Sequence, residues 1–272
     1  MTKPIVTLAT SADFPNLDED DRGLSDALRE RGIEPHVAIW DDPAVNWDDA
    51  GVVVMRSVRD YATKDKYAAF LEWARSLSRV ANHSDVVTWN SDKHYLGRLA
   101  DLGVPMIPTT WLEPTAGLSK HQVHTRFPAR GDFVVKPAIS SGGRGTGRYT
   151  STHAGSRSQA INDAMHHLRH GRSVMVQRYL QQVDRGGEIS LVYFNGILSH
   201  AVDKAPMLHP RFRSTDEVHE EVVTAREPSE QEWLWGERVR KAIHGLIKEH
   251  AGRDIQLLFN RVDMVGDGQG GF

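Results

Sequence analysis

The sequence predicts an α/β protein, in which an N-terminal parallel sheet is followed by two further lobes that each contain a sheet. Three observations predict this class. Apolar runs of strand length alternate with amphipathic stretches over the first third. The most glycine-dense segment, residues 140–148, follows a β-branched run in the middle. The last third is rich in strand-like runs around the hairpin signal Asn195-Gly196. The 272 residues suffice for two to three lobes around a shared cleft.

The first lobe is expected over residues 1–88. Helices are expected at Asp21–Ile33 and Lys64–Val80, where apolar side chains recur on one helical face. Apolar or β-branched runs predict buried strands before the first helix, at Ile5–Thr10, and between the two helices, at His36–Trp40 and Val52–Met55. Strands that alternate with helices in this way favour a parallel sheet with helices packed on it, so this lobe is predicted to be Rossmann-like.

Residues 89–176 and 177–272 predict the second and third lobes. In the second, we expect helices at Lys93–Leu102 and about Ser156–His170, and strands at Phe133–Lys136 and Ser173–Tyr179. In the third, one long amphipathic helix is expected at Glu230–His250. Three strands are expected there, at Glu188–Phe194, Ile197–Val202 and Ile255–Val265. The charged stretch Arg211–Glu227 is expected to be a mobile loop.

Composition excludes several classes of function. The net charge of −3 argues against sequence-independent nucleic-acid binding, which usually needs a basic excess. The chain has no cysteine, which excludes disulfides, thiolate nucleophiles and zinc ribbons. No apolar run approaches the roughly 20 residues of a membrane span, and the first ten residues resemble a strand more than a signal peptide. We therefore expect a cytoplasmic protein without nucleic-acid or membrane partners.

The glycine-dense loop suggests an anion site, because glycines let backbone N–H groups approach a phosphate. The Walker A and dinucleotide-binding patterns do not fit, since Arg148-Tyr149 follows Gly147 and the spacing of the glycines differs. A tight hairpin is the alternative interpretation. Lys136 precedes the loop on a predicted strand, where its ammonium would be a fixed charge for a phosphate.

The order of motifs resembles the ATP-grasp superfamily from about Asn90 to the end of the chain. It comprises Lys93 after Asn-Ser-Asp, Lys136 before the Ser/Gly loop, a later hinge strand, Glu188 after Gly-Gly, and Arg261-x-Asp263. Further segments, at residues 40–43, 89–93 and 108–112, are similar to the small glutathione-synthetase-like and RimK-like ligases. Within that group the chain is similar to ligases of the D-cycloserine synthetase type.

The resemblance implies a site for ATP and Mg²⁺ clamped between two lobes. The implied nucleotide-binding residues are Lys93, Lys136, Ser140, Ser141, Gly142, Gly143, Gly145, Gln177, Arg178, Tyr179, Leu180 and Glu188. It also implies that Lys204 and Arg213 approach the γ-phosphate, Arg261 steadies the oxyanion, and Asp263 is a magnesium ligand. Each residue also fits an ordinary structural or surface role. The clustered His166, His167 and His170 are expected to lie on a solvated helix face rather than at a metal.

The segment Arg56-Ser57-Val58-Arg59-Asp60-Tyr61 is the candidate substrate site. It follows a predicted buried strand, and ligands bind at the carboxyl ends of such strands in open α/β sheets. Arginine can hold a carboxylate through two hydrogen bonds, and aspartate can hold an ammonium, so Arg56, Ser57, Arg59, Asp60 and Tyr61 would suit an amino acid. A capped helix start with a salt bridge is the alternative. Relatives often have Thr and Trp where this chain has Val58 and Arg59, which suggests an altered substrate.

The resemblance implies an ATP-dependent ligase that activates an amino-acid-like carboxylate as an acylphosphate for attack by nitrogen. The D-cycloserine type implies cyclisation of O-ureido-D-serine. The alternatives are ligation of an amino acid to a second amine, or a nucleotide-binding regulator without turnover. The regulator is considered because only Asp263 of the family's metal ligands is present, and we expect the remaining ligands beyond Phe272. A homo-oligomer is a family-level expectation.

Overall fold

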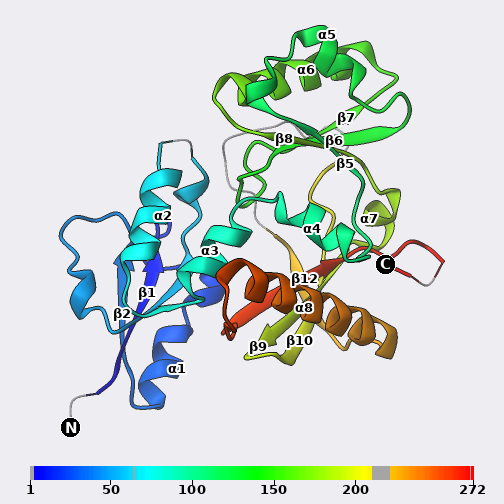
Figure 1. The fold of residues 1–272 in the computed structure, drawn as a ribbon. Helices are drawn as coiled ribbons and strands as arrows, with labels where there is room; N and C mark the ends of the chain where they lie inside the picture. The colour runs from blue at the N-terminus through cyan, green and yellow to red at the C-terminus, as the bar shows by residue number, and fades with distance from the viewer. Residues whose placement is uncertain (1–2, 64, 210–220, 270) are drawn as a thin grey trace. The chain divides into compact units, whose positions relative to one another are not determined.

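The computed structural model describes residues 3–63, 65–209, 221–269 and 271–272 (Figure 1). The chain divides into two compact units, which are described separately. The first contains residues 1–90 and 247–259, and the second contains residues 91–246 and 260–272. Within the described ranges, no helix is both long enough and apolar enough to cross a membrane.

The first unit is built on a parallel sheet with strand order β2-β1-β3-β4. Its strands are β1 (Ile5–Thr10), β2 (Glu34–Ile39), β3 (Val52–Ser57) and β4 (Val80–Ala81). Its helices are α1 (Leu24–Glu30), α2 (Tyr67–Ser76) and α3 (Ser84–Asn90), with single turns η1 (Glu19–Asp21), η2 (Trp47–Asp49) and η3 (Asp60–Ala62). The parallel sheet confirms the predicted fold class. The predicted helix at residues 64–80 was too long, because α2 ends at Ser76 and Val80 enters β4.

Aromatic side chains dominate the core of the first unit. Trp40, which follows β2, packs edge-on against Phe70 of α2 with ring centroids 5.6 Å apart. Trp73, one helical turn further along α2, lies 5.6 Å from Trp40 and 5.0 Å from Trp47. These contacts fix α2 to the sheet and hold the segment that follows β2.

The second unit contains two antiparallel sheets. The central sheet has strand order β5-β8-β6-β7 and is formed by β5 (Thr109–Leu112), β8 (Val174–Arg178), β6 (Asp132–Pro137) and β7 (Gly147–Thr150). Helices α5 (Lys120–Thr125) and α6 (Ala154–Arg169) lie on the same side of this sheet in Figure 1. Val123, Ala160 and Leu168 of these helices share one core with Phe133 and Tyr149 of the sheet. The glycine-dense loop therefore joins two neighbouring antiparallel strands, β6 and β7.

The C-terminal sheet has strand order β11-β10-β9-β12. Its strands are β9 (Glu188–Phe194), β10 (Ile197–Lys204), β11 (Val223–Arg226) and β12 (Phe259–Met264), and helix α8 (Glu230–Ala251) packs on it. Asn195 and Gly196 join β9 to β10 with φ of 53° and 79°, so the predicted tight hairpin turn is confirmed. The remaining elements of this unit are α4 (Tyr95–Asp101), η4 (Pro114–Ala116) and α7 (Gln181–Gly186).

Two predictions for the last third were wrong. Residues 223–226 were expected within a mobile loop, but they pair with β10 as edge strand β11. The predicted strand at residues 255–265 is shorter, because β12 begins only at Phe259. Ile255 and Leu257 are buried without entering the sheet, so their apolar character reflects packing rather than strand pairing.

Candidate active site

The glycine-dense loop leaves β6 and enters β7 through two tight turns. The amide of Arg144 donates to the carbonyl of Ser141 at 3.2 Å, and the amide of Thr146 donates to the carbonyl of Gly143 at 3.0 Å. Gly143 and Gly145 have positive φ of 74° and 68°, which favours glycine at both positions. A Cβ at Gly145 would lie 2.8 Å from the imidazole of His167, so the loop packs closely on α6 there.

Two lysines lie beside this loop. Lys93, in the turn before α4, donates through Nζ to the carbonyl and the hydroxyl of Ser140, both at 2.9 Å, and to the carbonyl of Ala138 at 3.3 Å. Lys136 is on β6, and its Nζ has no hydrogen-bond or ion-pair partner among the described residues. An ammonium placed like this has lost water without gaining a counter-ion, which is unfavourable until an anion binds.

The pKa values of both lysines show this cost. Burial, together with the neighbouring charge of Lys136, lowers the pKa of Lys93 to about 7, although Asp92 opposes the shift. Burial also lowers the pKa of Lys136, and only the charge of Glu188 favours its ammonium form. A bound polyanion would stabilise both charges, so this part of the unit suits a ligand that carries phosphates.

Polar contacts hold the carboxyl end of β8, the predicted hinge strand. Gln177 is buried, and its amide nitrogen donates to the hydroxyl of Thr109 at 2.7 Å. Tyr179 donates its phenol to Asp184 at 2.6 Å, and the guanidinium of Arg148 lies 3.5 Å above its ring. Arg178 is exposed, and Leu180 is the N-cap of α7. Arg148, which was not predicted as a site residue, therefore links the residues that follow β8 through Tyr179 and Asp184.

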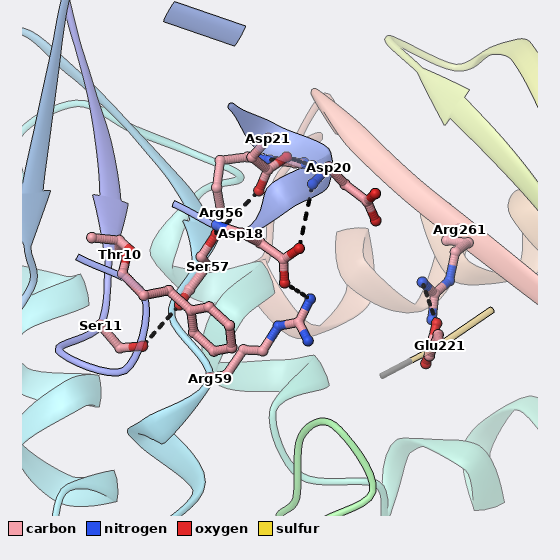
Figure 2. A network of polar contacts seen from close by, with 11 residues as sticks. Thr10, Ser11, Asp18, Asp20, Asp21, Arg56, Ser57, Arg59, Glu221 and Arg261 are labelled. Atoms are coloured by element: carbon pink, nitrogen blue, oxygen red, sulfur yellow. Dashed lines mark hydrogen bonds and ion pairs between the residues drawn. The ribbon is translucent and has the colours of Figure 1, made fainter. Parts of the chain in front are cut away.

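A cluster of opposite charges covers the C-terminal sheet where β9, β10 and β12 lie side by side. Lys204 Nζ is 3.2 Å from Glu221, 3.7 Å from Glu188 and 3.9 Å from Asp263. Arg261 Nε is 2.8 Å from Asp263. Its Nη1 is 4.0 Å from Glu221, a contact that Figure 2 shows. Glu188 and Lys204 are direct cross-strand partners. The structure therefore brings together four predicted residues, namely Glu188, Lys204, Arg261 and Asp263.

The carboxylate of Asp263 is held in its ionised form. Burial alone would raise its pKa, but the charges of Arg261 and Lys204, with a 2.6 Å hydrogen bond from Ser190 Oγ, lower it below its ordinary value. Burial and the charge of Asp263 raise the pKa of the Tyr95 phenol on α4, although the charge of Arg261 opposes this shift. An ionised oxygen ligand of this kind suits Mg²⁺.

Three residues of this cluster were not predicted. Ser190 has a signal in the sequence, because it lies two residues after Glu188 on one strand and therefore faces the same side. Glu221 lies in the stretch that was predicted to be a mobile loop, and Tyr95 has no distinctive motif. Arg213, predicted to approach the γ-phosphate, lies outside the described residues.

The described side chains do not form a complete metal site by themselves. Within the described part of the chain, no group of three or more His, Asp or Glu side chains is arranged to hold a metal ion. One ionised carboxylate, Asp263, fits a magnesium ion only if other oxygens, such as those of phosphates, complete its coordination.

The three clustered histidines at the end of α6 were predicted to lie on a solvated helix face. This was wrong for His167, which is buried with Nε2 3.1 Å from the carbonyl of Gly145.

In the first unit, the predicted substrate residues at the end of β3 and just after it divide into two groups. Arg56 and Ser57 contact Asp21, with distances of 2.6 Å from Arg56 Nη2 and 3.2 Å from Ser57 Oγ. Arg59 Nη2 is 2.5 Å from Asp18, so both arginines pair with the segment that follows β1 (Figure 2). Neither aspartate was predicted, because their contacts depend on chain segments far apart in sequence.

The other group turns into the core. Asp60 is buried, and its two oxygens accept hydrogen bonds from Trp40 Nε1 at 2.9 Å and from Lys66 Nζ at 2.5 Å. Tyr61 stacks on Phe70 with ring centroids 4.8 Å apart. The five predicted substrate residues therefore do not lie together, since only Arg56, Ser57 and Arg59 share one network.

Comparison with known proteins identifies the family to which this chain belongs. A sequence model of the N-terminal domain of D-cycloserine synthetase DcsG matches residues 6–82. The cycloserine biosynthesis protein DcsG of Streptomyces lavendulae is 32% identical over 98% of this chain and 87% of its own length. The chain belongs to the DcsG family. A crystal structure of D-cycloserine synthetase DcsG matches this DcsG-family chain with a TM-score of 0.83 at 32% identity, covering 98% of this chain and 88% of that one.

The wider fold is that of ATP-grasp ligases. The ATP-grasp ligase PsnB, in a structure with a minimal precursor, Mg and ADP, matches with a TM-score of 0.53 at 19% identity, covering 99% of this chain and 87% of its own. The predicted ATP-grasp resemblance is confirmed for this DcsG-family member, as is its α/β class. ATP and magnesium are typical ligands of this fold.

Proposed function

We propose that this DcsG-family protein is an ATP-dependent carbon–nitrogen ligase that closes O-ureido-D-serine to D-cycloserine. The observation that carries the proposal is the pair of half-buried lysines beside the glycine-dense loop, in a chain related to D-cycloserine synthetase over 98% of its length. Neither ammonium group has a carboxylate of the described residues in direct contact, and a triphosphate supplies the missing negative charge.

The residues then take distinct roles. Lys93 and Lys136 bind phosphate oxygens, the loop from Ser140 to Gly145 covers them, and Gln177 to Leu180 line the adenine. The substrate carboxylate attacks the γ-phosphate and ADP leaves. The oxygen-linked nitrogen of the ureido group then displaces phosphate from the activated carboxyl and closes the ring, and water removes its carbamoyl group as carbon dioxide and ammonia. Such chemistry depends on positioning and electrostatics, so no nucleophilic side chain is needed.

The charged cluster of the C-terminal sheet would serve the reacting end. Arg261 offers a guanidinium to the developing oxyanion, and Lys204 offers a second cation to the transferred phosphoryl group. Asp263 would hold Mg²⁺, which supplies charge neutralisation on the phosphates when bound. For the substrate itself, Arg59 and Asp18 offer complementary charges, whereas the buried Asp60 has both oxygens in use.

The test is ADP release from ATP and Mg²⁺ with a panel of amino-acid-like carboxylates, followed by mass spectrometry of each product. We expect turnover with O-ureido-D-serine and a product lighter than its substrate. A product that gains an amine would instead show intermolecular ligation. Lys136→Ala should abolish ATP binding, whereas Lys248→Ala, at an exposed position on α8, should not. Unchanged ATP affinity in Lys136→Ala would show that the loop was misinterpreted.

A further inference from the structure

A closed ring of hydrogen bonds surrounds the turn that carries Lys93. The backbone amide of Lys93 donates to the carbonyl of Ala138 at 3.1 Å, and the amide of Ala138 donates to the carbonyl of Ser173 at 2.9 Å. Ser173 Oγ donates to Glu113 Oε2 at 2.5 Å, and Glu113 Oε1 lies 3.1 Å from His94 Nε2. Since His94 follows Lys93 in the chain, the ring closes on itself and joins four separate segments.

His94 is the only member of this ring that lies between two carboxylates. Its Nδ1 is 2.6 Å from Asp92 Oδ1, and its Nε2 is 3.1 Å from Glu113 Oε1. Its ring also stacks on Trp111, with centroids 4.0 Å apart and planes 20° apart. A neutral imidazole has one N–H and one lone pair, so one carboxylate would face a lone pair. Only the imidazolium donates to both, and therefore this geometry requires the charged form.

We propose that His94 is a positioning residue for Lys93: as an imidazolium clamped between Asp92 and Glu113, it fixes the turn that presents the Lys93 ammonium to nucleotide phosphates. The inference rests on the proposed ATP site. Without the clamp, the turn before α4 loses its link to Glu113 and, through Ser173, to the backbone of Ala138. Lys93 Nζ would then lose its fixed place beside Ser140.

The pH dependence follows from the two carboxylates. Burial lowers the pKa of His94, but the hydrogen bonds and charges of Asp92 and Glu113 outweigh it, so the pKa lies above the ordinary value of 6.5. Because the pKa of His94 is higher in the folded chain than in the unfolded chain, its stabilising contribution is complete at pH values below its pKa in the unfolded chain. That contribution is lost as the pH rises through its pKa in the folded chain. Lys93, whose pKa is lowered to about 7, loses its charge over a neighbouring range, so the two titrations must be separated by variants.

The protonation state is tested by NMR of ¹⁵N-labelled protein without any nucleotide. The His94 signals are assigned by their loss in His94→Gln, and both ring nitrogens are expected to be protonated at about pH 6.5, where a free imidazole is half neutral. Glu113→Gln should lower the His94 pKa. A neutral tautomer at that pH in the wild type would overturn the proposal.

The positioning role is tested by ATP affinity at two pH values, with the exposed His121→Gln of α5 as the control. At about pH 6, His94→Gln should bind ATP roughly threefold more weakly than the wild type, as expected for a partly exposed charge pair. At a higher pH this difference should shrink, because wild-type His94 loses its proton as the pH rises through its raised pKa. Equal affinities at the lower pH would refute the role of His94 alone. Absence of ATP binding by the wild type would refute the proposed function instead.

Discussion

Nucleotide binding should be accompanied by proton uptake at Lys93. Burial and Lys136 lower the pKa of this ammonium to about 7, so at about pH 8 roughly nine-tenths of the Lys93 side chains are neutral. A phosphate oxygen in contact with Nζ favours the charged form and raises the pKa again. Binding should therefore draw about 0.9 proton from solution at this one residue. The pKa of Lys136 is lowered in the same direction, so any contribution of this residue adds to the uptake at Lys93.

The assay is isothermal titration calorimetry with ATP and Mg²⁺ in two buffers of different ionisation enthalpy, since proton uptake makes the measured enthalpy depend on the buffer. Lys93→Arg isolates the residue, because arginine keeps the charge but stays protonated over this range. We expect the uptake to fall by about 0.9 proton in this variant and to be unchanged in the exposed control Lys248→Arg. Equal uptake by Lys93→Arg and the wild type would refute the reasoning about this lysine.

Three further predictions concern the surroundings of the site. Gly187→Ala should lower the free energy of unfolding by more than Gly171→Ala in urea denaturation. Both glycines have positive φ, which costs about 1–2 kcal/mol for alanine, but only at Gly187 would the Cβ lie 2.2 Å from the carbonyl oxygen of Lys204. Equal losses would show that β9 and β10 are not packed as described. Asp60→Asn should cost about 1–3 kcal/mol, because Trp40 and Lys66 are left with a poorer acceptor, whereas the more exposed Asp41→Asn should cost less. An increase in stability in Asp60→Asn would contradict a structural role for this carboxylate. Arg59→Trp should change the choice of substrate, measured as kcat/KM across the panel, more than the KM for ATP. The reverse result would remove Arg59 from the substrate site.

Much of the fold follows from local patterns that do not depend on tertiary context. Ile5–Thr10 and Glu188–Phe194 form the predicted strands because β-branched and apolar residues fit a buried, pleated surface. Asn195-Gly196 forms its turn because both residues tolerate positive φ. Strand β11 escaped prediction because three of its four residues are exposed at the edge of a sheet, so no apolar pattern marks it.

In the candidate site, too, residues that belong to a sequence motif could be predicted, whereas partners from distant segments could not. Lys136, Glu188 and Asp263 were predicted because the order of motifs along the chain carries them, and Glu188 and Asp263 do lie in one cluster with Lys204. Partners that come from distant segments left no local signal. The Arg59–Asp18 pair is an example, and so is the contact of Glu113 with His94.

The central claim is that ATP drives ring closure of one amino-acid-like substrate, and one measurement tests it most directly. Purified protein is incubated with ATP, Mg²⁺ and O-ureido-D-serine, and ADP, phosphate and the organic product are quantified together. The account predicts equal amounts of ADP, phosphate and a cyclic product lighter than its substrate, with no product in Lys136→Ala. ADP formation that does not rise above the level without O-ureido-D-serine, or a product that carries an added amine, would contradict it.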